Sequence, residues 1–231
     1  MKDTNPHPSR LVVLFDVDNT LLDNDRVTAD LREHLDVEVG PERAQRYWAI
    51  FEQLRTELGY ADYLGALQRY RGEYPHELHL LAVSKFLINY PFKTRLYPKA
   101  LEAIKHVRCW GTPAILSDGD VVFQPRKVNC SGLWNAVNGN VMIYVHKELE
   151  LADVEERYPA QHYVLVDDKL RILSAVKKLW GQRVTTVFVR QGHYALDPKV
   201  VSAYPAADRS IESIGELLKF DANWLPVIDV V

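Results

Sequence analysis

Apolar residues along the chain fall into short continuous runs that alternate with segments of helical spacing. The first run, residues 11–15, is followed at once by polar residues. An uninterrupted apolar run of this length predicts a strand buried on both faces, as in the middle of a parallel sheet. Further strands are predicted at residues 112–116, 141–145, 163–166 and 184–189, and helical segments at residues 101–107, 121–133, 149–158, 170–180 and 211–220, the last capped by Ser210. Because such alternation implies right-handed crossovers, we predict an α/β fold with a parallel sheet.

The alternation is interrupted directly after the first strand, where residues 23–90 carry no strand signal. Pro41 begins a helix with one apolar stripe, and Asp62 is a candidate cap for the next. Residues 76–89 predict a further helix, apolar on much of its circumference, which we expect inside a helical packet. A connection this long is unusual. The sequence therefore predicts an α/β core of residues 1–22 and 91–231 and an all-helical insert of residues 23–90, with chain crossings near Asp23 and residues 90–92.

Polar side chains that could take part in catalysis or bind a metal follow four of the predicted strands. Two carboxylates at the end of a buried strand are costly to leave unpaired, and carboxylate oxygens suit Mg²⁺. Because the carboxyl ends of parallel strands share one edge of a sheet, we expect all these side chains to converge there. They are Asp16 and Asp18 after the first strand, Ser117, Asp118 and Gly119 after the second, Lys147 after the third, and Asp167 and Asp168 after the fourth.

The segment DVDNT at residues 16–20 resembles the first motif, DxDxT, of the haloacid dehalogenase-like hydrolase superfamily, most members of which are phosphatases. The resemblance implies a Rossmann-like core in which Asp16 is the nucleophile and Asp18 the general acid/base. The segment LSDG resembles the second motif, in which the hydroxyl of Ser117 and nearby backbone N–H groups hold phosphoryl oxygens. Gly119 lets the backbone approach an anion closely.

Lys147 resembles the lysine of the third motif, whose ammonium offsets the charge of phosphate and carboxylate together. The family often has Pro after this lysine, whereas this chain has Glu148. Lys127 is the rival, but it lies in a predicted helix rather than after a strand. The segment VDD resembles the fourth motif, which makes Asp167 a direct Mg²⁺ ligand beside Asp16 and the backbone carbonyl of Asp18, with Asp168 supporting the site.

The resemblance implies Mg²⁺-dependent hydrolysis of a small phosphate monoester through an aspartyl-phosphate, under a helical cap formed by residues 23–90. Dehalogenation is an alternative, but halide leaves without a proton, so the carboxylate of Asp18 favours phosphoryl transfer. A phosphomutase and a non-catalytic relative that binds a phosphorylated ligand also remain open. We expect a small phosphorylated metabolite as the partner of this site.

Composition narrows the other classes of partner. The 231 residues carry 28 basic and 31 acidic side chains, a net charge of −3 that gives no electrostatic case for nucleic acid or an anionic membrane. Cys109 and Cys130 lack metal-ligand spacing and predict reduced thiols. Residues 1–10 contain no apolar signal segment and no apolar run is long enough to span a membrane, so we expect a cytoplasmic protein. The sequence leaves the oligomeric state open.

Several arginine and aromatic side chains of the insert could contact a substrate, although they belong to no recognisable motif. The arginines of the helix that Pro41 begins are interpreted as a solvated face, and its two large aromatic residues as packing. These are Arg43, Arg46 and Arg55, and Tyr47 and Trp48.

Overall fold

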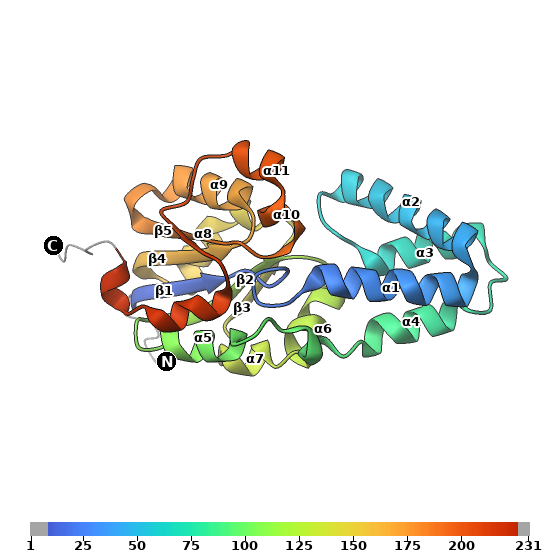
Figure 1. Cartoon of the computed structure of the whole chain (residues 1–231), viewed down its shortest axis with the longest axis horizontal. Helices are drawn as coiled ribbons and strands as arrows, with labels where there is room; N and C mark the ends of the chain where they lie inside the picture. Colours follow the sequence, from blue (N-terminus) through green and yellow to red (C-terminus); the bar gives the residue numbers. More distant parts are fainter. Residues whose placement is uncertain (1–8, 226–231) are drawn as a thin grey trace, which may run out of the picture.

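A computed structural model describes residues 9–225 of the chain. Its centre is a parallel sheet of six strands in the order β3-β2-β1-β4-β5-β6 (Figure 1). This order reverses direction beside β1, which is where open α/β sheets form their ligand crevice. The strands are β1 (Ser9–Phe15), β2 (Thr112–Asp118), β3 (Val141–Tyr144), β4 (Ala160–Asp167), β5 (Val184–Val189) and β6 (Arg209–Ile211).

Strand β1 is the centre of the core because its side chains alternate between two apolar layers. Val13 and Phe15 belong to one cluster, whereas Val12 and Leu14 belong to the other. The first layer lies under α5 (Ala100–Val107), α6 (Phe123–Cys130), α7 (Leu133–Ala136) and the 3₁₀ helix η4 (Ile214–Lys219), and the second under α8 (Leu151–Arg157) and α9 (Leu170–Trp180). Burial on both faces explains the uninterrupted apolar run, and the predicted parallel α/β sheet is confirmed.

Register fixes the place of the polar strand ends. Phe15 pairs with Ile115 on β2 and with Val166 on β4. The residues that follow Phe15, Leu116 and Val166 therefore reach the same edge of the sheet. The chain leaves this edge through Asn19, whose backbone is left-handed at φ 62°, a conformation that asparagine tolerates.

Residues 24–89 contain helices and loops only, and they form the second lobe in Figure 1, beyond the carboxyl edge of the sheet. The helices are α1 (Asn24–Val39), α2 (Pro41–Leu58), α3 (Tyr63–Glu73) and α4 (Leu80–Asn89). The caps at Asp23 and Asp62 each accept a backbone N–H of the first turn. Helix α4 buries only Val83 and Leu87, so the expectation of an interior helix was wrong. None of the helices in the described chain is long and apolar enough to cross a membrane.

The outgoing and returning chains run side by side between the two lobes. Leu22 pairs with Leu96 in an antiparallel bridge, and the N–H of Asp23 donates to the carbonyl of Arg95 at 2.8 Å. The return therefore lies at residues 95–97, later than the predicted 90–92. The return comes later because Tyr90, which precedes the 3₁₀ helix η1 (Phe92–Arg95), and Arg95, which ends it, both bind Asp30 of α1.

The last part of the core differs from the predicted helix at residues 211–220. Ser210 lies within β6 opposite Phe188 and caps no helix. The residues that follow form η4, which is a 3₁₀ helix. Ile211, Ile214 and Leu217 are buried at intervals of three residues, which suits the three residues per turn of a 3₁₀ helix. After η4 the described chain ends with η5 (Ala222–Trp224), and the remaining short elements are η2 (Lys147–Leu149), η3 (Gly181–Arg183), α10 (Gly192–Leu196) and α11 (Pro198–Ser202).

Because side chains of β1 pack into both core layers, shortening one of them should lower the free energy of unfolding substantially. We expect Leu14→Ala, at a side chain with no exposed surface, to lower the free energy of unfolding by about 2–5 kcal/mol. Leu78→Ala, the same change at a side chain 85% exposed, is the control and should change it by less than about 0.5 kcal/mol. Urea denaturation followed by circular dichroism measures both, and equal effects would contradict this account of the core.

Candidate active site

Lys147 lies at the centre of the predicted site. Its Nζ donates to Asp16 Oδ1 at 2.6 Å and to the carbonyl of Leu116 at 3.3 Å. It also lies 2.7 Å from Asp167 Oδ2, close enough for an ion pair although the angle does not make a hydrogen bond. Burial alone would lower the pKa of Lys147, but the carboxylates of Asp16 and Asp167 raise it well above its usual value. The lysine is therefore a buried cation that joins the ends of β1 and β4.

Two contacts hold the Lys147 segment, η2, in place. The backbone N–H of Lys147 donates to Asp118 Oδ1 at 2.7 Å. Glu148, at the position where the family often has Pro, pairs with Arg171 of α9 at 2.5 Å. An ion pair to a neighbouring helix thus anchors the segment here.

Three buried carboxylates converge beside Lys147. Asp16, Asp167 and Asp168 each place an oxygen within 4.8 Å of the others. Asp16 Oδ2 and both oxygens of Asp168 are buried and have no hydrogen-bond partner in the described chain. Burial, reinforced by the neighbouring carboxylates, raises the pKa of Asp167 to about 6 and that of Asp168 well above its usual value. Unpartnered buried carboxylate oxygens are what a hard divalent cation requires, so the donor set fits Mg²⁺.

Asp18 lies outside this group of three. Lys127 Nζ donates to Asp18 Oδ1 at 2.6 Å and to Asn24 Oδ1 of α1 at 3.0 Å. Gln124 Nε2 lies 3.5 Å from Asp18 Oδ2 and donates to Ser117 Oγ at 2.9 Å. The sequence predicts that Asp18 binds the cation through its backbone carbonyl, and this stays a prediction. The carboxylate of Asp18 instead contacts Lys127 and Gln124 of α6.

The predicted phosphate-binding turn is arranged differently from the expectation. The N–H of Gly119 donates to the carbonyl of Tyr144 at 2.9 Å, so it is not free for an anion. A side chain at Gly119 would meet Gln124 Cβ at 2.7 Å, which explains why glycine is needed there. Asp118 binds the backbone of Lys147, and its carboxylate would repel a phosphate. Among the side chains of these three residues, the hydroxyl of Ser117 is the donor that suits an anion, and phosphate binding by this turn stays a prediction.

A cavity of about 700 Å³ separates this edge from the helical lobe. Lys169 and Tyr194 line it from the core, with the ammonium 5.3 Å from the ring centroid. Arg55 and Trp48 line it from α2, which corrects their interpretation as a solvated face and as packing alone. The guanidinium of Arg55 donates to the hydroxyl of Tyr194. By contrast, Arg43 and Arg46, which are both exposed, form ion pairs with Glu77 and Glu73, and Tyr47 is buried.

Comparison with known proteins agrees with this arrangement. No family model and no curated protein matches the sequence. A solved structure from Burkholderia xenovorans LB400, described as a haloacid dehalogenase-like hydrolase, is 63% identical and superimposes with a TM-score of 0.89, covering 93% of this chain and all of the other. The chain belongs to the haloacid dehalogenase-like hydrolases.

More distant members of this hydrolase family share the fold. The L-2-haloacid dehalogenase of Xanthobacter autotrophicus is 20% identical, with 90% of this chain and 96% of that chain covered and a TM-score of 0.61. A HAD-hydrolase of Bacillus subtilis, described as bound to magnesium and as revealing interdomain movement, is 17% identical, with 91% and 97% covered and a TM-score of 0.59. These likenesses establish the architecture of this hydrolase and leave its substrate open.

The motifs did not predict Gln124 or Lys169 at the site of this hydrolase, and they set Lys127 aside as the rival of Lys147. Gln124 and Lys127 lie one helical turn apart in α6, directly after the second motif, and that spacing was the available signal. Lys169 follows the fourth motif immediately. Burial would lower the pKa of Lys169, but the carboxylates of Asp168, Asp16 and Asp167 raise it.

If the three carboxylates hold a cation, removing one charge should weaken binding. We expect Asp168→Asn to reduce the affinity for Mg²⁺ at least about tenfold in calorimetric titration. Without the metal the variant should be about as stable as the wild type, because it removes one of three buried carboxylates that repel one another. Asp36→Asn, at an exposed carboxylate of α1, is the control. Unchanged affinity in Asp168→Asn would rule out this cation site.

Proposed function

We propose that this hydrolase is a Mg²⁺-dependent phosphatase that cleaves a small phosphate monoester through an aspartyl-phosphate. The observation that carries the proposal is the pair of carboxylates at the end of β1, each with its own lysine. Lys147 holds Asp16 and Lys127 holds Asp18. A dehalogenase has no need of the second carboxylate, because halide leaves without a proton.

The first half of the reaction forms a bond from Asp16 to phosphorus. Lys147 holds Asp16 Oδ1, and Oδ2 has no hydrogen-bond partner in the described part of the chain, so the carboxylate has a free oxygen. The bond from phosphorus to the ester oxygen breaks as Asp18 gives that oxygen a proton, and the alcohol leaves. Lys147 and the hydroxyl of Ser117 stabilise the transferring group.

The second half returns the enzyme to its starting state. Asp18, now ionised, takes a proton from water, and the hydroxide oxygen attacks phosphorus. The bond to Asp16 breaks and inorganic phosphate leaves. Mg²⁺ bound by Asp16, Asp167 and Asp168 would supply the positive charge that offsets the phosphoryl oxygens. The Bacillus subtilis structure, described as bound to magnesium, supports this choice of ion.

We further propose that residues 23–90 act as a cap on a core of residues 1–22 and 91–231. The cavity between the two lobes supports this, since closure there would exclude water while the aspartyl-phosphate forms. The paired crossings at residues 21–23 and 95–97 are the proposed hinge.

The central test replaces the nucleophile. Asp16→Asn should abolish release of phosphate from an aryl phosphate while the fold persists, because an amide is a poor nucleophile. Wild-type activity should vanish in excess chelator and be poorly restored by Ca²⁺, whose looser coordination misplaces the reacting groups. Turnover of 2-chloropropionate with no turnover of phosphates would favour a dehalogenase, and phosphoryl transfer to a second alcohol a phosphomutase.

The two lysines should differ in their contribution. Lys147→Ala should lower kcat at least about 10²-fold, because its ammonium stabilises the transferring group directly. Lys127→Ala should lower kcat less, since Asp18 itself remains and Lys127 has no direct contact with the transferring group in the proposed scheme. Steady-state kinetics on the aryl phosphate, with thermal denaturation to check that each variant folds, measures the ranking. A larger loss of kcat in Lys127→Ala would show that Lys127, and not Lys147, makes the contact with the phosphoryl group.

A further inference from the structure

Arg32 of α1 is a cation on the cavity wall that the reaction scheme does not use. The other two guanidinium groups on that wall are occupied. Arg55 binds Tyr194 and lies 3.4 Å from Glu52, and Arg171 pairs with Glu148. Arg32 has no carboxylate and no hydrogen-bond partner within residues 9–225, and its guanidinium carbon lies 4.4 Å from the ring centroid of Trp48.

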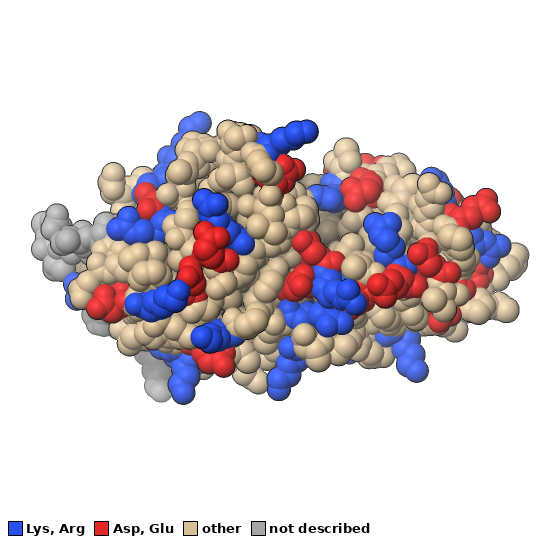
Figure 2. All heavy atoms as spheres, in the orientation of Figure 1, with Lys and Arg blue, Asp and Glu red and all other residues tan. Residues whose placement is uncertain are grey.

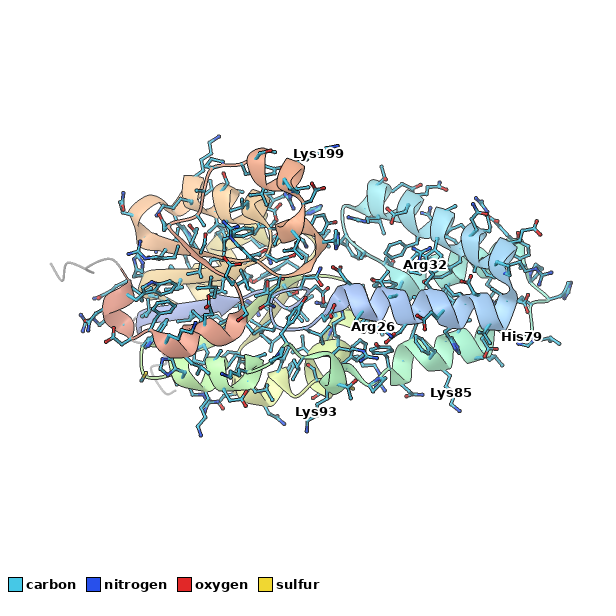
Figure 3. The ribbon with its side chains drawn as sticks, in the orientation of Figure 1. Arg26, Arg32, His79, Lys85, Lys93 and Lys199 are labelled. Atoms are coloured by element: carbon cyan, nitrogen blue, oxygen red, sulfur yellow. The ribbon has the colours of Figure 1, made fainter. Side chains whose placement is uncertain are left out.

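The position of Arg32 on α1 determines how far its guanidinium lies from Asp18. Asn24, Thr28 and Arg32 lie at intervals of four residues, so they share one face of α1, and all three line the cavity. Figure 3 shows Arg32 on the side of α1 that faces α2 and α3. Asn24 touches Lys127, the partner of Asp18. Eight residues of helix span about 12 Å, and helical side chains lean toward the N-terminus, which brings the guanidinium to roughly 10 Å from Asp18.

The wall of the lobe near Arg32 is aromatic. Trp48 and Phe51 of α2 meet edge to face with ring centroids 5.4 Å apart, and Phe51 stacks on Tyr63 of α3 at 4.8 Å. All three side chains are largely buried and line the cavity. An apolar or planar organic body fits such a wall, whereas a small, fully hydrated metabolite gains little from it.

We propose that the substrate is a phosphate monoester with a second anionic group, and that Arg32 binds that second group. The phosphate lies beside Asp16 and Ser117, the organic body lies along Trp48, Phe51 and Tyr63, and the far anion accepts hydrogen bonds from the guanidinium. Arg32 is therefore a specificity-determining residue. This assignment rests on the proposed phosphatase function, but the contact with the far anion is measurable without turnover.

The test uses matched ligands that differ only in the far group. Phosphonate analogues, which cannot be hydrolysed, carry either a carboxylate or its neutral amide on an alkyl chain of four to eight carbons, and a third series carries a second phosphonate. Calorimetric titration in the presence of Mg²⁺ compares the wild type with Arg32→Gln and Arg32→Lys. Arg26→Gln is the matched control, because Arg26 lies on the same helix but pairs with Asp30 and does not line the cavity (Figure 3).

We expect the wild type and Arg26→Gln to prefer an anionic far group over the amide by about tenfold, with an optimum in chain length. Arg32→Gln should bind both with similar affinity, and Arg32→Lys should keep part of the preference. The corresponding phosphate esters should show the same ratios in kcat/KM, mainly through KM. No preference in the wild type, or an equal preference in Arg32→Gln, would overturn the assignment. A preference that depends on Arg32 in a protein that hydrolyses no phosphate ester would overturn the phosphatase and leave the anion site standing.

Discussion

The architecture depends on a single buried ammonium group between two buried carboxylates. Asp16, Asp167 and Asp168 lie at one edge of the sheet because parallel register brings the ends of β1 and β4 together, and three carboxylates in so little water repel one another. Lys147 offsets part of this charge at 2.6 Å from Asp16 and 2.7 Å from Asp167. The remaining repulsion makes the site receptive to a divalent cation. Removing either partner of such a buried pair leaves an uncompensated charge, which is strongly unfavourable.

A second lysine keeps the other carboxylate of β1 separate from the first. Lys127 belongs to α6, and its ammonium contacts Asp18 of the core and Asn24 of α1. The orientation of Asp18 is thus linked to the place where the helical lobe begins. A displacement of α1 relative to the sheet would change the surroundings of Asp18, while Asp16 would stay fixed by Lys147. The core therefore holds Asp16 through Lys147, whereas the contact between the lobes bears on Asp18.

The sheet was predictable because a continuous apolar run has few alternatives, and the strand ends were predictable because each polar residue there interrupts such a run. Contacts between elements distant in sequence were not predictable in the same way. Lys127 was recognised as lying in a helix, but its reach to Asp18 depends on where α6 lies. The mistaken helix at residues 211–220 has a local cause: apolar residues three apart share a face in a short α-helix as well as in a 3₁₀ helix. Arg55 looked solvated because a helix facing a cavity has the same polar pattern as one facing bulk water.

The distinction between phosphatase and dehalogenase must come from the site, because proteins of this fold carry out different reactions. An alkoxide leaving group needs a proton and a halide does not, so the diagnostic group is Asp18. Lys127 and Gln124 both lie against this carboxylate, and Lys127 is almost fully buried in doing so. Burying an ammonium group is costly, and the cost is offset only where its partner carboxylate is present. A chain that had no use for an acid at this position could replace both groups with apolar ones and gain stability. Retention of the pair is therefore an argument for proton transfer to a leaving oxygen.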